Sequence, residues 1–202
     1  MSHQRFPVAA ACLVMVLITQ SFLLAEEKPK SDVPEKGTDL GNYVPTTTTW
    51  VVVSPTLAKF NGRNTCLAGI YRQEKTISIY AQTEEKNVWN LLHAVDRTLK
   101  DHPEIKAYIV INKSLRDNRG SNVSGQRFRE TQELAKTHDF KYLDVSLCRS
   151  PSKHLFDQQT PLKFVYSEKR IVKLSKKFPK TDQALKEVPA LIAEVVKLAN
   201  AK

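Results

Sequence analysis

Residues Ile77 to Leu92, ISIYAQTEEKNVWNLL, change from a strand pattern to a helix pattern within one short stretch. Thr76 to Ala81 is uncharged and rich in β-branched residues, which predicts a buried strand. From Glu84 to Lys100 apolar residues recur at helical spacing, which predicts a helix with one buried face. Between the two patterns lies Thr83-Glu84-Glu85-Lys86-Asn87, which has no cysteine and no glycine-rich loop. This stretch therefore predicts a strand followed by a helix, with no nucleophile between them.

The segments that follow continue the alternation of strands and helices. Ala107 to Ile111 (AYIVI) is wholly apolar, as expected of a central parallel strand covered on both faces. A second helix is predicted from Gln126 to Thr137, and another strand from Tyr142 to Leu147. Leu162 to Tyr166 and Ile171 to Leu174 form a predicted hairpin. Strands separated by helices favour right-handed crossovers and a parallel core, to which the hairpin adds an antiparallel pair.

The folded domain is predicted to cover residues 49–202. It begins with a short strand at Trp50 to Val53 and ends with a helix whose main segment starts at Pro189, because proline suits the first turn of a helix. The polar stretch from Ser114 to Gly125 is predicted to be a loop, either a lid or a simple insertion.

The N-terminal segment indicates export. Val8 to Ala25 is an apolar run followed by charged residues, which is typical of a signal peptide cleaved after Ala25. The same run is long enough to remain as a membrane anchor, which is the alternative. Residues 26–48 are rich in Pro, Gly, Lys, Glu and Thr, so we predict a flexible linker.

The predicted order of elements resembles the thioredoxin-like fold. The resemblance is carried by ISIYAQ (77–82), AYIVI (107–111) and above all TPLKFVYSEKRIV (160–172). Thr160-Pro161 matches the residue pair that precedes the family's hairpin, where the proline forms a cis peptide facing the active site. The extra strand at 142–147 is similar to one in the periplasmic thiol-reductase and peroxiredoxin branches. The resemblance implies a thioredoxin-like mixed sheet, with a parallel core and a C-terminal antiparallel hairpin, flanked by helices.

The sequence departs from this family at the active site. Where the family places Cys-x-x-Cys at the start of the helix, this chain has Glu84-Glu85-Lys86-Asn87, so no thiolate can form there. A structural role explains the turn, with Thr83 as helix N-cap and both glutamates near the positive end of the helix dipole. The resemblance implies that an extended peptide or protein partner would bind along Gln82, Thr83, Glu84 and Thr160-Pro161.

Two cysteines remain if the first 25 residues are removed. Cys66 and Cys148 could form a disulfide in an oxidising compartment, or could be two free buried thiols. Cys148 is followed by Arg149, and positive neighbours can activate a thiol. These two residues are the only candidates for catalysis, and the alternative function is a thiol-disulfide oxidoreductase that uses them.

The charge pattern suggests a third class of function. The formal net charge is +10, and Lys173, Lys176 and Lys177 lie in a strongly basic segment. An exported protein would meet an anionic envelope polymer rather than nucleic acid. The aromatic residues Phe164 and Tyr166 alternate with their neighbours, so burial explains them better than base stacking.

No metal or cofactor is expected. His93, His102, His138 and His154 show no metal-binding spacing, and His102 and His138 are expected near helix C-termini, where a charged ring is favourable. The leading hypothesis is therefore an exported thioredoxin-like protein that binds a partner and is not an enzyme.

Overall fold

The structure is a computed structural model that describes residues 37–113, 124–148, 155–156 and 160–201. The strands are β1 (Thr49–Val53), β2 (Asn64–Thr65), β3 (Lys75–Ala81), β4 (Ile105–Ile111), β5 (Leu143–Cys148), β6 (Leu162–Glu168) and β7 (Ile171–Phe178). The helices are the 3-10 turn η2 (Ala58–Phe60), α2 (Leu67–Ile70), α3 (Lys86–Leu99), α4 (Ser124–His138) and α5 (Thr181–Asn200).

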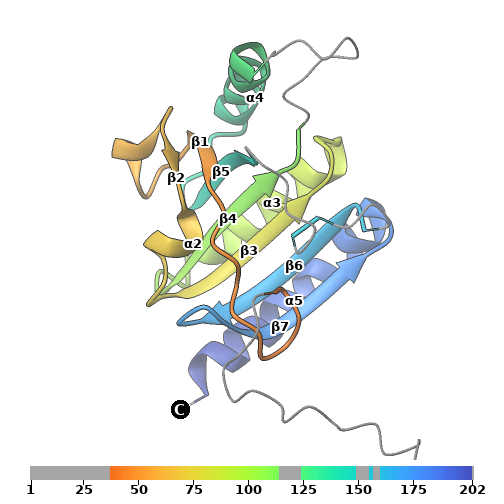
Figure 1. Ribbon diagram of the computed structural model, residues 1–202. Helices are drawn as coiled ribbons and strands as arrows, with labels where there is room; N and C mark the ends of the chain where they lie inside the picture. The colour runs from red at the N-terminus through yellow and green to blue at the C-terminus, as the bar shows by residue number, and fades with distance from the viewer. Residues whose placement is uncertain (1–36, 114–123, 149–154, 157–159, 202) are drawn as a thin grey trace, which may run out of the picture. The chain divides into compact units, whose positions relative to one another are not determined.

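The described strands form one seven-stranded sheet in the order β2-β1-β5-β4-β3-β6-β7 (Figure 1). The pairs β3–β4 and β4–β5 are parallel, whereas β6 pairs antiparallel with both β3 and β7. The predicted mixed sheet with a parallel core is confirmed. At the other edge, β1 pairs antiparallel with β5 and with the very short β2. The strand β1 was predicted, whereas β2 was not.

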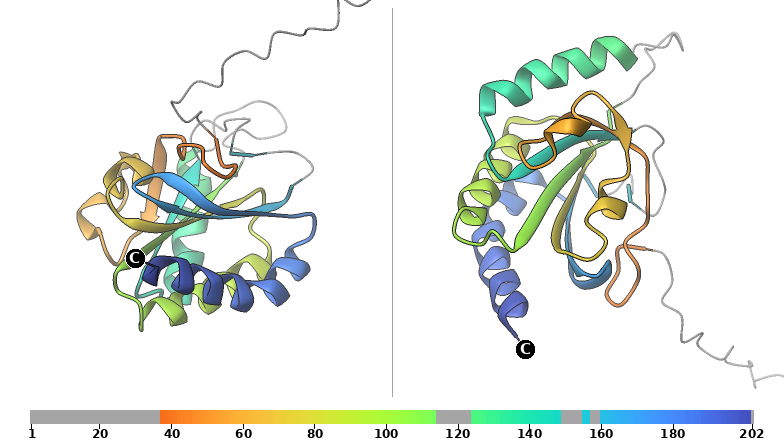
Figure 2. Two further views of the ribbon diagram at one scale, coloured as in Figure 1. Left: turned by 90° about the horizontal axis from the view of Figure 1, so that it is seen from below. Right: turned by 90° about the vertical axis from the view of Figure 1, so that its left-hand side faces the viewer.

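Each face of the sheet is buried by different elements. Helices α3 and α5 lie on one side and α2 on the other, as Figure 2 (right) shows. In β4, Ile109 and Ile111 face the first layer, whereas Tyr108 and Val110 face the second. This explains the uninterrupted apolar run, because a strand covered on both faces has no polar side.

The β6–β7 hairpin closes through a two-residue turn. Lys169 and Arg170 both have positive φ values, 49° and 69°. Turns of this kind match the right-handed twist of the strands that they join. The predicted hairpin is confirmed, and both strands extend further than predicted.

The prediction that the last helix starts its main segment at Pro189 is wrong. Helix α5 begins at Thr181 and contains Pro189 in its interior. Pro189 is exposed, so the carbonyl that loses its N–H partner can be hydrated. The buried stripe runs past the proline on both sides and offsets its cost: Thr181, Ala184, Val188, Leu191, Ile192, Val195 and Ala199.

The N-terminal part of the described chain lies against β7. The N–H of Gly41 donates to Val172 O at 3.0 Å, and the N–H of Val44 donates to Arg170 O at 2.8 Å. Residues 41–44, which the sequence assigns to a flexible linker, therefore cover the start of an edge strand. The predicted signal peptide, residues 26–36 of the linker and loop residues 114–123 lie outside the described residues. None of the helices in the described part of the chain is long and apolar enough to cross a membrane.

Candidate functional site

Polar residues from neighbouring strands meet at the carboxyl edge of the parallel strands. Gln82 directly follows β3, Asn112 directly follows β4, and Cys148 ends β5. The register places these three residues side by side, and Pro161, which precedes β6, lies on the other side of Gln82. Two hydrogen bonds join this row. The N–H of Gln82 donates to Pro161 O at 2.8 Å, and Asn112 Nδ2 donates to Gln82 Oε1 at 2.7 Å. In open α/β sheets this edge is where ligands bind.

The structure brings the predicted edge residues Gln82 and Pro161 together, but with a trans proline. No peptide bond within the described residues is cis, and these include Thr160 and Pro161. The cis bond implied by the family resemblance is therefore not observed.

An ion pair links the turn between β3 and α3 to the residues that follow β4. Lys113 Nζ donates to Glu84 Oε2 and, at 3.1 Å, to Thr131 Oγ1, while the Thr131 hydroxyl donates to Glu84 Oε1. The side chains of Lys113 and Glu84 are only 18% and 14% exposed. Because Thr131 is fully buried, the pair is held between β3, β4 and α4 rather than at the surface.

The predicted cap of the first helix is wrong. Helix α3 begins at Lys86, two residues later than predicted, and Glu85 is its N-cap residue without a side-chain cap. The Thr83 hydroxyl instead donates to Glu85 Oε1 at 2.9 Å, and Thr181 donates to Glu85 Oε2 at 2.8 Å. The two glutamates thus bond to different parts of the fold. Glu84 bonds to α4 and to the end of β4, and Glu85 bonds to α5.

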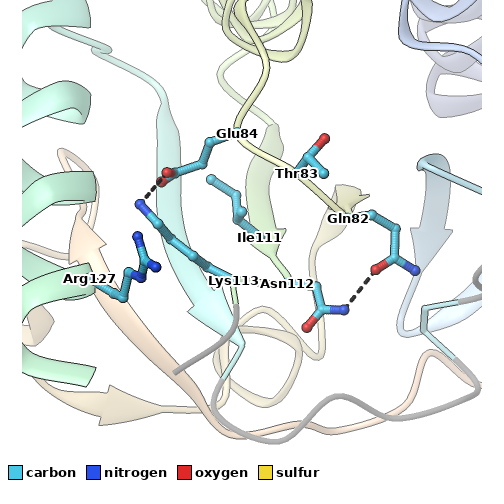
Figure 3. A pocket seen from close by; sticks show the side chains of 7 residues that line it. All are labelled: Gln82, Thr83, Glu84, Ile111, Asn112, Lys113 and Arg127. Atoms are coloured by element: carbon cyan, nitrogen blue, oxygen red, sulfur yellow. Dashed lines mark hydrogen bonds and ion pairs between the residues drawn. The ribbon is translucent and has the colours of Figure 1, made fainter. Parts of the chain in front are cut away.

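A cavity of about 270 Å³ opens at this edge (Figure 3). Its lining comes from three places: the β3–α3 turn, the end of β4, and α4. The residues are Gln82, Thr83, Glu84, Ile111, Asn112, Lys113 and Arg127.

Arg127 adds a second cation to the cavity. In Figure 3 its guanidinium extends from α4 toward the ammonium end of Lys113. Glu130 Oε2 lies 3.4 Å from Arg127 Nη1 and 3.7 Å from Lys113 Nζ. A hydrogen bond from Gln126, with the two cations adding, holds the pKa of Glu130 below its usual range.

Sequence reasoning missed Asn112, Lys113 and Arg127. A signal for the first two was present, since polar residues that directly follow adjacent parallel strands meet at one edge of a sheet. Arg127 had none, because the inner face of its helix could not be recognised from its weak periodicity.

Neither cysteine lines this cavity. Cys66 and Cys148 are thiols, and both belong to the apolar cluster on the α2 side of the sheet. Cys148 is 1% exposed. Asn112 and Gln82 stand between Cys148 and Pro161, so three strand spacings, about 14 Å, separate the last two.

The candidate anion-binding lysines do not share one face. Lys176 and Lys177 are consecutive in β7 and point to opposite sides of the sheet, where Lys176 contacts Glu187 at 3.4 Å and Lys177 lies 3.9 Å from Asp39. Lys173 is exposed. Phe164 and Tyr166 are fully buried, so their assignment to the core is confirmed.

His138 is the last residue of α4, which confirms its expected place near a helix C-terminus, but burial opposes a positive ring there. Its Nδ1 lies 2.9 Å from His93 Nε2, and its ring stacks on Trp89. Burial, together with the charge of His93, lowers the pKa of His138, so the neutral ring is favoured. Among the described residues there is no group of three or more His, Cys, Asp or Glu side chains that could hold a metal ion.

Comparisons with known proteins identify the fold only. No protein-family model matches the sequence, and no curated protein matches it. Among solved structures, a domain of a possible thiol-disulfide isomerase from Cytophaga hutchinsonii matches 85% of this chain and 100% of its own, with 12% identity and a TM-score of 0.50.

Two other solved structures show weaker similarity. An exposed lipoprotein thioredoxin from Streptococcus pneumoniae matches 72% of this chain and 99% of its own, at 14% identity and a TM-score of 0.45. A mutant peroxiredoxin 6 of Arenicola marina matches 77% and 74%, at 11% identity and a TM-score of 0.46. The strand order, the β6–β7 hairpin and the similarity to the Cytophaga hutchinsonii domain all indicate the same fold. The chain therefore has the thioredoxin-like fold.

Proposed function

We propose that this protein is an exported, non-enzymatic module that binds an extended peptide or protein segment at the carboxyl edge of its sheet. The observation that supports the proposal most directly is the cavity between β3, β4 and α4. Amide, hydroxyl and charged groups line it above the fully buried Ile111, so several polar groups converge on one space, as they do in binding sites.

The chemistry of the cavity favours binding over thiol catalysis. The turn before α3 carries Glu84, whose carboxylate is engaged by Lys113 and Thr131. A carboxylate held in this way is neither a redox group nor a free base. Polar groups that are already positioned reduce the ordering cost of binding, because they need not be immobilised again.

The site is also connected to Pro161 by hydrogen bonds. Gln82 is bonded to Pro161 through its backbone and to Asn112 through its side chain. An extended segment that leaves the cavity past Gln82 would therefore run along the predicted edge of Thr83 and Thr160-Pro161.

Replacing Thr83 with tryptophan is expected to abolish peptide binding at this edge. Thr83 is exposed and lines the cavity, so the larger ring would fill the entrance without disturbing the core. Binding would be measured with the full chain and fluorescein-labelled octapeptide pools, by fluorescence anisotropy. Thr137→Trp, at an exposed position near the end of α4, is the matched control. Equal binding by the two variants would place any peptide site elsewhere.

A thiol-disulfide role for Cys66 and Cys148 is the second candidate, because both thiols contribute to one apolar cluster. Alkylation and intact mass across glutathione redox buffers would decide it. We expect the thiol count to stay constant, since Cys148 is buried and buried thiols are inert. A joint loss of both thiols to a disulfide, with reduction of glutathione disulfide, would support the oxidoreductase instead.

Two further assignments rest on the sequence. Export depends on the apolar run that ends at Ala25, with retention as a membrane anchor as the alternative. An anionic envelope polymer at Lys173, Lys176 and Lys177 is a separate proposal that no contact of the described residues favours.

A further inference from the structure

We propose that the cavity recognises the C-terminal carboxylate of the bound peptide, held by Arg127 in front of Lys113. This inference rests on the proposed peptide-binding function and specifies which part of the peptide enters the cavity. It follows from the charge of the lining, the hydrogen-bonding state of the two cations, and the size of the cavity.

Two cations line the cavity and can attract an anion. Arg127 and Lys113 both line the cavity, whereas Glu84 is the one carboxylate in the lining. Glu130, which approaches both cations, lies outside the lining and has a side chain 41% exposed. The lining itself thus holds two cations and one carboxylate, and Glu130 balances the second cation from outside the lining.

The two cations differ in how fully they are used. Lys113 directs its ammonium toward Glu84 and Thr131. Within the described residues Arg127 makes one hydrogen bond, from Nη1 to Glu130 at the long distance of 3.4 Å. A guanidinium has five N–H donors in a rigid fork that matches the two oxygens of a carboxylate. Arg127 thus has N–H donors that are available to a ligand, and the nearby Lys113 adds a second positive charge.

The dimensions of the site fit one terminal residue. A volume of about 270 Å³ is smaller than the cavities that hold drug-sized ligands or cofactors. Ile111 lies beneath the other lining residues and is fully buried, and the linked amides of Asn112 and Gln82 lie toward Pro161. A peptide could therefore end at Arg127 and extend back toward Pro161 in one continuous path.

The test compares two octapeptide pools of the same composition, one with free C-termini and one amidated, on the full chain by fluorescence anisotropy. We expect the free pool to bind at least roughly tenfold more tightly, as befits a charge-assisted bidentate contact. Arg127→Gln should remove this preference. Arg129→Gln, two residues away on the same helix, exposed and outside the lining, should preserve it.

The possible results separate the two proposals. Equal binding of the two pools, abolished by Thr83→Trp, would overturn carboxylate recognition and leave the peptide site intact. Carboxylate recognition by Arg127 is equally overturned if Arg127→Gln and Arg129→Gln bind the free pool alike. Tight binding of an amidated pool that contains internal glutamates would assign the cavity to an acidic side chain, contradicting the terminal assignment. No binding of either pool would overturn the peptide-binding function itself.

Discussion

Replacing Lys113 with methionine is expected to lower the free energy of unfolding by about 3 kcal/mol. The variant keeps most of the side-chain volume but leaves the Glu84 carboxylate, 14% exposed, with Thr131 as its remaining hydrogen-bond donor. A largely buried charge without its counter-ion is costly, because it gives up hydration and gains no compensating attraction. Urea denaturation of the full chain, followed through the tryptophans, gives the free-energy difference.

Two controls show whether the effect comes from burial. Lys141→Met breaks an exposed ion pair with Asp139, whose side chains are 62% and 74% exposed, and should cost less than about 1 kcal/mol. The double variant Glu84→Gln/Lys113→Met removes both charges and should recover much of the lost stability. If Lys113→Met and Lys141→Met destabilise the protein equally, the Glu84–Lys113 pair is not a buried ion pair in solution.

The main elements of the fold could be predicted because their signals are local. The apolar run of β4 and the hairpin around Lys169-Arg170 each depend on neighbouring residues in the chain. The start of α5 could not be predicted in this way. Pro189 has the local preference of a first helical turn, and only the packing of Ala184 and Val188 against the core extends the helix before it.

The candidate site was predicted in part. Gln82, Thr83 and Glu84 were placed at the edge because the resemblance to the thioredoxin-like fold assigns peptide binding to the turn after β3. Lys113 instead depends on Glu84, 29 residues away, and on Thr131, 18 residues away. A lysine after a strand is usually interpreted as a solvated side chain, and nothing in its local sequence shows that a glutamate from another turn meets it.

Asp144 provides the second large expected effect, on the opposite face of the sheet. Its carboxylate is fully buried and accepts hydrogen bonds from Ser54 at 2.6 Å, from Thr56 at 3.0 Å, and from the hydroxyl of Tyr71. These donors lie in the segment after β1 and at the end of α2. The Asp144 carboxylate therefore connects both of these segments to β5. Asp144→Ala would remove the acceptor that the three hydroxyls share, although those of Thr56 and Tyr71, 2.6 Å apart, can still bond to each other. We expect a loss of about 3 kcal/mol in urea denaturation.

The pH dependence of stability tests the same group with a smaller change. Burial raises the pKa of Asp144 above its usual value of 3.8, although the three hydroxyls oppose the shift. The folded protein therefore binds this proton more tightly than the unfolded chain does. The resulting stabilisation is complete below pH 3.8 and is lost as the pH rises through the raised pKa.

Asp144→Asn removes this ionisation and leaves the other acidic groups in place. The stability of the wild type relative to Asp144→Asn should consequently increase as the pH falls from 7 toward 4, measured by urea denaturation at each pH. A difference that is constant over this range, or that shrinks toward acid, would mean that the hydroxyls of Ser54, Thr56 and Tyr71 outweigh burial. Asp144 would then be a stabilised anion, and the connection between α2 and β5 would strengthen on ionisation rather than weaken.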